Sequence, residues 1–442
     1  MNHTKEYAVQ KKILGAAAAM ALALTGCAGG SDAPSGEGVP TDTPITLTVW
    51  SWDGTVEEAV PGFEELYPNI TVEVVNAGSS TDEYTALDNA IQAGSGIPDI
   101  AMFEYFSLPL FAIPGKLTDL SQFGAQDLAS DFVDAAWENV NIDGKPYALP
   151  SDYGPAAMFY NQAVLAEAGV TEPPATWDEY YEAAKKVRAL GPNHYITNDS
   201  ADIFLLLSMI WEGGGQPFKV DGTNVTIDFS DPGTTRAVEY WQKMLDEDLV
   251  NTKITGWSDD WNRGLNEGTL ATQVIGGWFT STLPERAPQA AGNFRVAPMP
   301  QWEEGETSGG ENGGSAMAIP EDAENKEAAY AFLEYFTHGA GLQPRVDAGA
   351  FVPKISNLED EEFLSATNEF FGDQRYNEVL AEASKNVATG WQYPPFFGWA
   401  RSSYEDVAAP LYDSEQGTLA ETLETWKQRS VEYGNEQGFT VD

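Results

Sequence analysis

The stretch from Ile45 to Phe103 alternates strand-like and helix-like patterns, and this alternation limits the folds open to the chain. The segments are, in order, a run of β-formers at 45–50, apolar residues at helical spacing over 56–67, a strand pattern at 70–75, a helical pattern at 82–93 and a strand pattern at 98–103. Strand, helix, strand, helix, strand is typical of a parallel sheet covered by helices. The sequence therefore predicts an α/β fold.

Polar or aromatic residues follow each of these three strands. Trp52 and Asp53 follow the first, residues 78–82 follow the second, and Glu104 and Tyr105 follow the third. Because ligands of open α/β sheets bind outside the carboxyl ends of the strands, these loops are candidates for a binding site.

The later part of the chain contains a hairpin pattern, an apparent break and a long loop. Residues 140–149 predict a hairpin that turns at Asp143-Gly144. Residues 150–155 hold two prolines and are expected to interrupt the chain before a strand at 156–160. Further predictions are a loop or crossover at 301–314, a strand at 316–320, a helix at 326–336 and a mostly helical remainder from 360, with an aromatic cluster at 391–399.

The first 26 residues are typical of a secretory signal peptide. Lysines at positions 5, 11 and 12 precede an apolar run at 13–24 that ends in small residues. A membrane helix needs about 20 apolar residues, so this run is too short to span a bilayer.

Cys27, the only cysteine of the chain, follows this run directly. The sequence Leu24-Thr25-Gly26-Cys27 resembles the lipobox of bacterial lipoproteins, in which the chain is cleaved before the cysteine and the thiol receives a diacylglyceryl group. The resemblance implies a protein anchored by lipid at the outer face of the cell membrane, with 27–43 as the lipidated residue and a flexible tether. A free thiol beside an ordinary cleavage site is the alternative.

Charge and cysteine content exclude several kinds of partner and cofactor. The formal net charge is -45, which opposes binding to nucleic acid, to anionic lipid headgroups and to polyanionic ligands. No second cysteine is present for a disulfide or a Cys-based metal site, and the three histidines are scattered. No phosphate-binding or dinucleotide-binding glycine motif appears, so no cofactor is expected.

An ordered set of motifs along the mature chain resembles one protein family. The motifs are Gly-Ile-Pro-Asp-Ile at 96–100, Asn-Ile-Asp-Gly-Lys-Pro-Tyr-Ala-Leu-Pro at 141–150, Phe-Tyr-Asn at 159–161, Thr-Trp-Asp-Glu at 176–179, Leu-Asn-Glu-Gly-Thr-Leu-Ala at 265–271 and Ile-Gly-Gly-Trp at 275–278. They are similar to those of the extracytoplasmic solute-binding proteins of ATP-driven carbohydrate importers, the family that includes maltose-binding protein.

This resemblance implies a fold of two α/β lobes, each with a mainly parallel sheet flanked by helices, that close like a hinge around a sugar. Lobe one would comprise 44–152 and 312–356, and lobe two 153–311 and 357–442. The crossovers would lie at 151–155, near 309–314 and near 356–360. The implied protein is a monomer that hands an extracellular oligosaccharide to the membrane permease subunits of the importer.

A sugar site needs aromatic plates for the CH faces and carboxylates or amides for the hydroxyls. By the family pattern the plates would be Trp278 and Trp399, with Trp52 and Trp391 as further candidates; Trp50, Trp177, Trp241 and Trp426 are expected in the core. The polar and backbone candidates at the cleft are Asp53, Glu104, Tyr105, Asp152, Asp199, Asp202 and Gly314. The third loop, Phe-Glu-Tyr-Phe at 103–106, departs from the maltose-binding pattern, which puts maltose specificity in doubt.

Two other functions are compatible with an acidic, aromatic-rich, secreted chain. A glycoside hydrolase would use paired carboxylates, but no eightfold βα alternation is present. The same fold could bind another solute, such as a peptide, a polyamine, a metal or glycerol phosphate. A phosphorylated ligand would need cations in the cleft, for which Arg345, Arg375 and Arg401 are available. The sequence predicts a binding protein for a neutral oligosaccharide, without catalysis.

Overall fold

The first three strands form the parallel sheet that the sequence predicts. The computed structural model describes residue 39 and residues 43–78, 80–414 and 416–442, so Cys27 and the predicted signal peptide lie outside the described residues. β1 (Ile45–Trp50) pairs in parallel with β2 (Ile70–Val75) on one side and with β3 (Ile100–Glu104) on the other. The connecting helices are α1 (Val56–Leu66) and α2 (Thr81–Ala93). The predicted α/β class is confirmed.

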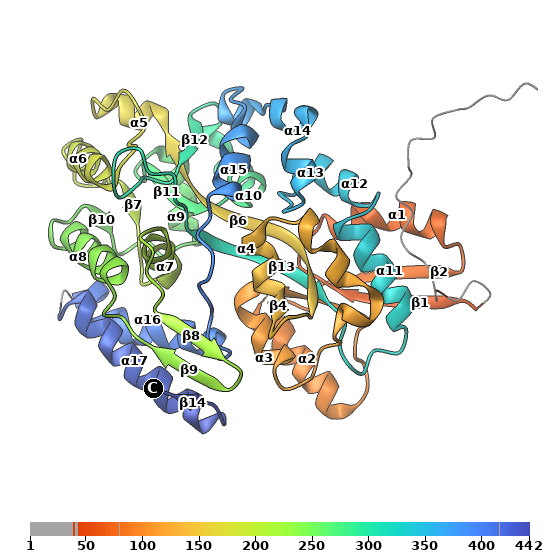
Figure 1. Cartoon of the computed structure of the whole chain (residues 1–442). Coiled ribbons are helices and arrows are strands. Elements are labelled where there is room, and N and C mark those ends of the chain that lie inside the picture. The colour runs from red at the N-terminus through yellow and green to blue at the C-terminus, as the bar shows by residue number, and fades with distance from the viewer. Residues whose placement is uncertain (1–38, 40–42, 79, 415) are drawn as a thin grey trace, which may run out of the picture. The chain divides into compact units, whose positions relative to one another are not determined.

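Two long strands continue this sheet in the opposite direction (Figure 1). β13 (Glu311–Ala318) pairs antiparallel with β3 and with the first half of β6 (Ala148–Asn161). The second half of β6 lies between β11 (Thr272–Gly276) and β12 (Phe294–Pro298), again antiparallel. The result is one seven-stranded mixed sheet, so a mainly parallel arrangement holds only for β1, β2 and β3.

The expected interruption at 150–155 is wrong, because these residues lie inside the continuous strand β6. Its pairing with β13 is irregular between Glu311 and Gly314 and again between Ser315 and Ala316. Prolines are tolerated at such irregularities because fewer ladder hydrogen bonds are needed there. Gly154 allows the close approach, since a Cβ on it would lie 2.4 Å from the carbonyl oxygens of Asn312 and Gly313.

The predicted hairpin is confirmed. β4 (Asn141–Ile142) pairs antiparallel with β5 (Lys145–Pro146) across a two-residue turn. Both turn residues have positive φ, 53° for Asp143 and 77° for Gly144. This backbone suits the twist of a hairpin, and Asp-Gly is a preferred pair for it.

The remaining elements surround the second half of β6 or cover the sheet. The helices are α3 (Leu108–Ala112), α4 (Asp134–Val140), α5 (Gln162–Glu167), α6 (Trp177–Arg188), α7 (Ile203–Glu212), α8 (Pro232–Asp246), α9 (Asp259–Glu267), α10 (Phe279–Arg286), α11 (Lys326–Thr337), α12 (Leu342–Asp347), α13 (Ile355–Leu358), α14 (Glu361–Ser365), α15 (Tyr376–Lys385), α16 (Phe397–Ser414) and α17 (Leu419–Glu436). The short strands are β7 (Thr197–Asn198), β8 (Phe218–Asp221), β9 (Asn224–Ile227), β10 (Val250–Asn251) and β14 (Thr440–Val441). No helix in the described ranges is both long and apolar enough to cross a bilayer.

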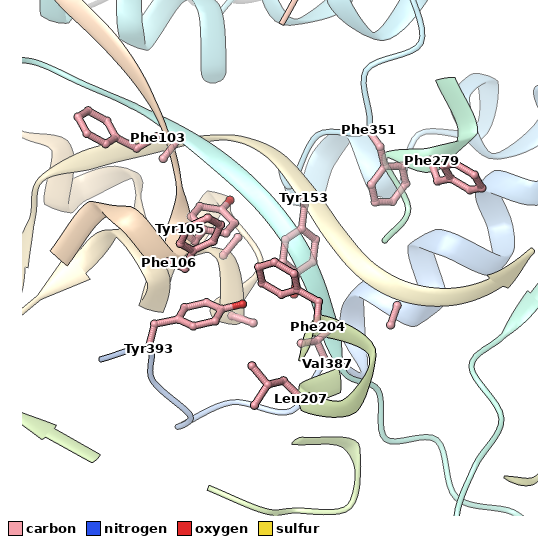
Figure 2. Close-up of a cluster of buried hydrophobic side chains, with 14 of the residues drawn as sticks. Phe103, Tyr105, Phe106, Tyr153, Phe204, Leu207, Phe279, Phe351, Val387 and Tyr393 are labelled. Carbon is pink, nitrogen blue, oxygen red and sulfur yellow. The ribbon is translucent and has the colours of Figure 1, made fainter. Parts of the chain in front are cut away.

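An aromatic cluster joins segments that are far apart in the sequence (Figure 2). Phe106, in the 3₁₀ turn η1 (Tyr105–Ser107) after β3, lies 5.6 Å from the ring of Phe204 on α7. It also contacts Tyr393 at 6.1 Å and Phe397 at 5.7 Å. This packing brings the end of β3 against α7 and the start of α16. Trp177, Trp241 and Trp426 are buried as expected, whereas Trp50 is only partly buried.

Candidate functional site

A cavity of about 200 Å³ lies where β7, β11, α7 and α16 meet. Its walls are β7 with the loop 199–202, Leu205, the loop 255–257, Trp261, the strand residues 273–275, Asn312 on β13 and two residues of α16, Arg401 and Glu405. The cavity combines an aromatic wall with amide, carboxylate and guanidinium groups. Such a mixture of apolar surface and a few polar groups is typical of small-molecule sites.

Trp257 provides the most exposed aromatic ring of the cavity wall. Its side chain is 42% exposed, and its φ of 67° is rare for a bulky residue. Strained backbone of this kind concentrates at functional sites. The ring stacks on Trp278 with centroids 5.8 Å apart and planes inclined by 25°. The sequence analysis did not predict Trp257 as a site residue. The feature that could have indicated it is a tryptophan after Gly256, just before the N-capped start of α9.

Trp278 supports this wall from behind. Its indole Nε1 donates to the carbonyl oxygen of Asn312 at 2.8 Å, which joins the start of α10 to β13. Gly276 leaves the space that the ring needs, because a Cβ there would lie 2.3 Å from Nε1. The structure therefore brings Trp278 next to the cavity, behind Trp257, although it does not line the cavity itself.

Asp199 and Asp202 both line the cavity, but their oxygens already serve the protein. Asp199 is buried and accepts from Trp241 Nε1 at 2.7 Å and from the Tyr412 hydroxyl at 2.8 Å. Its other oxygen accepts from the backbone of Ala201 and Asp202. Burial raises the pKa of Asp199 to about 6, against the effect of these hydrogen bonds. Asp202 caps α7 by accepting from the Phe204 backbone N–H.

The sequence analysis did not predict two side-chain amides of the cavity wall. Gln273 on β11 donates to the side-chain oxygen of Asn198 at 3.0 Å. Both residues line the cavity and retain further hydrogen-bonding capacity. The pairing of β11 with β6 places Gln273, the pairing of β7 with β10 places Asn198, and neither pairing is visible in the sequence.

Trp52 and Glu104 gather at the carboxyl ends of β1 and β3. The Trp52 ring meets the Tyr84 ring edge-on at 6.2 Å, and the Tyr84 hydroxyl hydrogen-bonds to the Glu104 carboxylate. Burial raises the pKa of Glu104, while the Tyr84 hydrogen bond and the charge of Arg401 lower it. Neither residue lines the cavity.

Asp53 and Asp152 take part in the junction of β1, β6 and β13. Asp53 lies 3.2 Å from the Arg345 guanidinium and also accepts from Thr55. Asp152 accepts from the backbone N–H and the hydroxyl of Ser315, both at 2.7 Å. Burial raises the pKa of Asp152 to about 6. The structure holds both carboxylates with partners from the chain itself, outside the cavity wall.

Four further candidates lie away from the cavity wall. The Tyr105 hydroxyl donates to the Asp152 carbonyl oxygen at 2.8 Å, and Gly314 gives the Tyr105 ring its space. Trp391 stacks on Trp211 at 3.9 Å inside the core. Trp399 stacks on Tyr433 of α17, at 3.9 Å and with planes inclined by 2°. None of these four residues lines the cavity.

Among the described residues no group of histidine, cysteine, aspartate and glutamate side chains could hold a metal ion. Of the cavity carboxylates, Asp199 and Asp202 are engaged with backbone, tryptophan and tyrosine donors. The arrangement thus suits recognition of an uncharged polar ligand.

The fold and this aromatic, amide-lined cavity are those of a solute receptor. The chain belongs to the family of bacterial extracellular solute-binding proteins, which it matches over residues 50–338.

Individual relatives refine this assignment. The chain is 43% identical to the transporter-associated binding protein of B. animalis subsp. lactis Bl-04, whose structure was solved in complex with β-1,6-galactobiose. That match covers 91% of this chain and 100% of the other, with a TM-score of 0.81. It is 27% identical to an arabinooligosaccharide-binding protein of Halalkalibacterium halodurans, covering 86% of this chain and 88% of the relative. It is also 24% identical to an uncharacterized lipoprotein of Streptomyces antibioticus, covering 76% and 74% of the two chains.

This protein is the oligosaccharide-binding component of a carbohydrate ABC importer. The family is not catalytic, so the glycoside-hydrolase alternative is set aside. The fold and the non-catalytic function expected from the sequence are confirmed.

Proposed function

We propose that the protein captures a short galactose-containing oligosaccharide, with β-1,6-galactobiose as the first ligand to test. The observation that carries this proposal is the 43% identity, over the full length of the relative, to the protein that was solved with this disaccharide. The cavity supports it, because Trp257 offers an exposed ring for a sugar face and Asn198 and Gln273 offer amides for hydroxyls.

Capture would proceed by closure of two lobes, 44–152 with 312–356 and 153–311 with 357–442. Two of the proposed boundaries fall on β6 and β13, the two strands that pair with each other through an irregular register at 150–155 and 311–316, and the third falls in α13. Such irregular pairing allows a local bend. A sugar that contacts both lobes only in the closed form would favour that form, and the closed form would then engage the permease subunits.

We further propose that the mature chain is a monomer anchored to the membrane by lipid on Cys27. The lipobox-like sequence at 24–27 supports this, and so does the similarity to a lipoprotein. Two acyl chains suffice for stable anchoring, so no spanning helix is required.

Titration calorimetry of the purified mature chain tests the ligand. Galacto-oligosaccharides, arabino-oligosaccharides and maltose are titrated separately, and the samples are then analysed by chromatography for cleavage products. Saturable binding of β-1,6-galactobiose with an unchanged sugar is the expected result. Binding of arabino-oligosaccharides in preference to galactobiose would reassign the ligand class.

Substitution of Cys27 tests the anchor. Cells that produce Cys27→Ala should release a folded, sugar-binding protein into the soluble fraction, whereas the unaltered protein should sediment with membranes. A serine variant in the tether, Ser35→Ala, is the control and should stay with the membranes. Membrane retention of Cys27→Ala would refute the anchor.

A further inference from the structure

Arg401 is the only cation among the described residues that line the cavity. It lies on α16, one helical turn before Glu405, which lines the same wall. A chain with 23 basic and 68 acidic residues has few cations to place, and this one faces the proposed ligand. The groups around Arg401 therefore affect which ligands the cavity can bind.

Two aromatic rings hold the guanidinium group. Its Cζ atom lies 5.0 Å from the centre of the Phe204 ring and 6.0 Å from the centre of the Phe106 ring. Figure 2 shows these two phenylalanines close together, one on α7 and the other in the turn after β3. Stacking of this kind restricts the orientation of the guanidinium while its N–H groups at the edge stay available.

Those donors are not used by the chain. Within the described residues, no hydrogen bond joins the Arg401 side chain to another group, and no carboxylate oxygen lies within 4.0 Å of it. Its charge nevertheless lowers the pKa values of Glu104 and Glu405, although burial raises both. Arg401 is therefore near these acids without forming a direct pair with either.

The surrounding charges favour a neutral ligand. Asp199, Asp202 and Glu405 line the cavity with Arg401, and the charge of Arg401 lowers the pKa of Glu104. Four carboxylates around one guanidinium would oppose a sugar acid or a sugar phosphate. A pair of neighbouring sugar hydroxyls suits the arrangement better, because their oxygens accept from the guanidinium and their hydrogens are donated to carboxylates.

We propose that Arg401 determines which sugar ring the cavity accepts, by donating from two guanidinium nitrogens to two neighbouring oxygens of a neutral sugar. This inference rests on the proposed function. The planar fork matches only oxygens at one spacing and direction, so inverting one hydroxyl of the ring breaks one of the two hydrogen bonds. A site built to bond a hydroxyl rejects a ligand that cannot supply it.

The test compares β-1,6-galactobiose with β-1,6-linked glucobiose, which differ in the orientation of the C4 hydroxyl of each ring, by titration calorimetry on the mature chain. Arg401→Lys keeps the charge but loses the fork. It should weaken galactobiose binding by about tenfold to a hundredfold, the range for a hydrogen bond to a charged group. Glucobiose binding should change less, so the ratio of the two dissociation constants should move toward one.

Arg401→Gln and Arg375→Lys complete the set. Arg401→Gln should lose selectivity like the lysine variant, and Arg375→Lys should behave like the unaltered protein, because Arg375 pairs with Glu361 and Glu378 outside the cavity. An equal loss for both sugars, or no loss, would overturn the role of Arg401. Tighter binding of digalacturonic acid than of galactobiose by the unaltered protein would overturn it as well. If the unaltered protein binds neither neutral disaccharide, the galacto-oligosaccharide proposal fails before the variants are compared.

Discussion

The guanidinium of Arg345 lies 3.2 Å from the carboxylate of Asp53, and the arginine side chain has no exposed surface. The same guanidinium donates to the Ser151 hydroxyl at 3.0 Å and lies over the Phe336 ring, with Cζ 3.7 Å from its centre. Burial lowers the pKa of Arg345, whereas Asp53 raises it. One buried pair thus joins the loop after β1 to β6 and α12.

We predict that Arg345→Met lowers the free energy of unfolding by about 3–5 kcal/mol, because Asp53 would then be a largely buried carboxylate without its partner. Urea denaturation followed by tryptophan fluorescence measures the change. Arg375→Met is the matched control; its ion pairs with Glu361 and Glu378 are exposed and should be worth about 1 kcal/mol or less. Equal losses of unfolding free energy in the two variants would show that the buried ion pair stabilises the fold no more than the exposed pairs do.

The Asp53 pair also shows how far the sequence could predict the site. Its place in the loop after the first strand followed from local patterns, but its partner is 292 residues away in the chain. Asp199 is similar, since its donors Trp241 and Tyr412 come from α8 and α16. Local sequence can predict which loops carry carboxylates. It cannot predict which of those carboxylates are already paired.

The fold was predictable where local patterns dominate. The strands at 45–50 and 70–75, the helix at 326–336 and the Asp-Gly hairpin agree with the structure within a residue or two. The mixed sheet was not predictable in this way, because β6 changes neighbours halfway along its length. Trp257 was not predicted either, because its exposure depends on how Trp261 and Trp278 pack around it, and local sequence does not show this packing.

A second prediction concerns the aromatic wall. Trp257→Ala should weaken galactobiose binding by at least tenfold, because the loss of ring stacking, on the order of 1 kcal/mol, adds to the loss of the apolar area that the ring buries against the sugar. Stability should change little, since the ring is 42% exposed. Trp399→Ala is the control: it removes a ring that stacks on Tyr433, outside the cavity wall, and should leave the dissociation constant unchanged. Titration calorimetry measures the dissociation constant of each variant. Weaker binding by Trp399→Ala with unchanged binding by Trp257→Ala would place the sugar site at Trp399 instead.

A third prediction separates two aspartates that line the same cavity. Asp199→Asn should cost about 1–3 kcal/mol of stability, because an NH2 group would replace one carboxylate oxygen and would face either the Trp241 and Tyr412 donors or the backbone N–H groups of Ala201 and Asp202. Asp202→Asn should cost almost nothing, because asparagine caps a helix about as well as aspartate does. Chemical denaturation of both variants measures the difference. Comparable losses would argue against the hydrogen-bond arrangement around Asp199.

The last prediction uses Glu83, a carboxylate of α2 with no exposed surface. One of its oxygens accepts from the Met102 backbone N–H at 3.2 Å, and the other has no hydrogen-bond partner among the described residues. Burial raises the pKa of Glu83 from 4.5 to about 8. In the folded protein the group therefore keeps its proton up to about pH 8, whereas in the unfolded chain it loses the proton near pH 4.5.

Between these two values the folded state binds more protons than the unfolded state, so the Glu83 contribution to stability falls as pH rises. The slope of this contribution is at most about 1.4 kcal/mol per pH unit. Glu83→Gln cannot ionise, so its stability relative to the unaltered protein should rise steadily from pH 5 to pH 8 and level off above. Urea denaturation at each pH measures the difference. Asp82→Asn, an exposed neighbour on the same helix, should give a difference that stays constant over this range. A constant difference for Glu83→Gln as well would mean that Glu83 is ionised in the folded protein throughout.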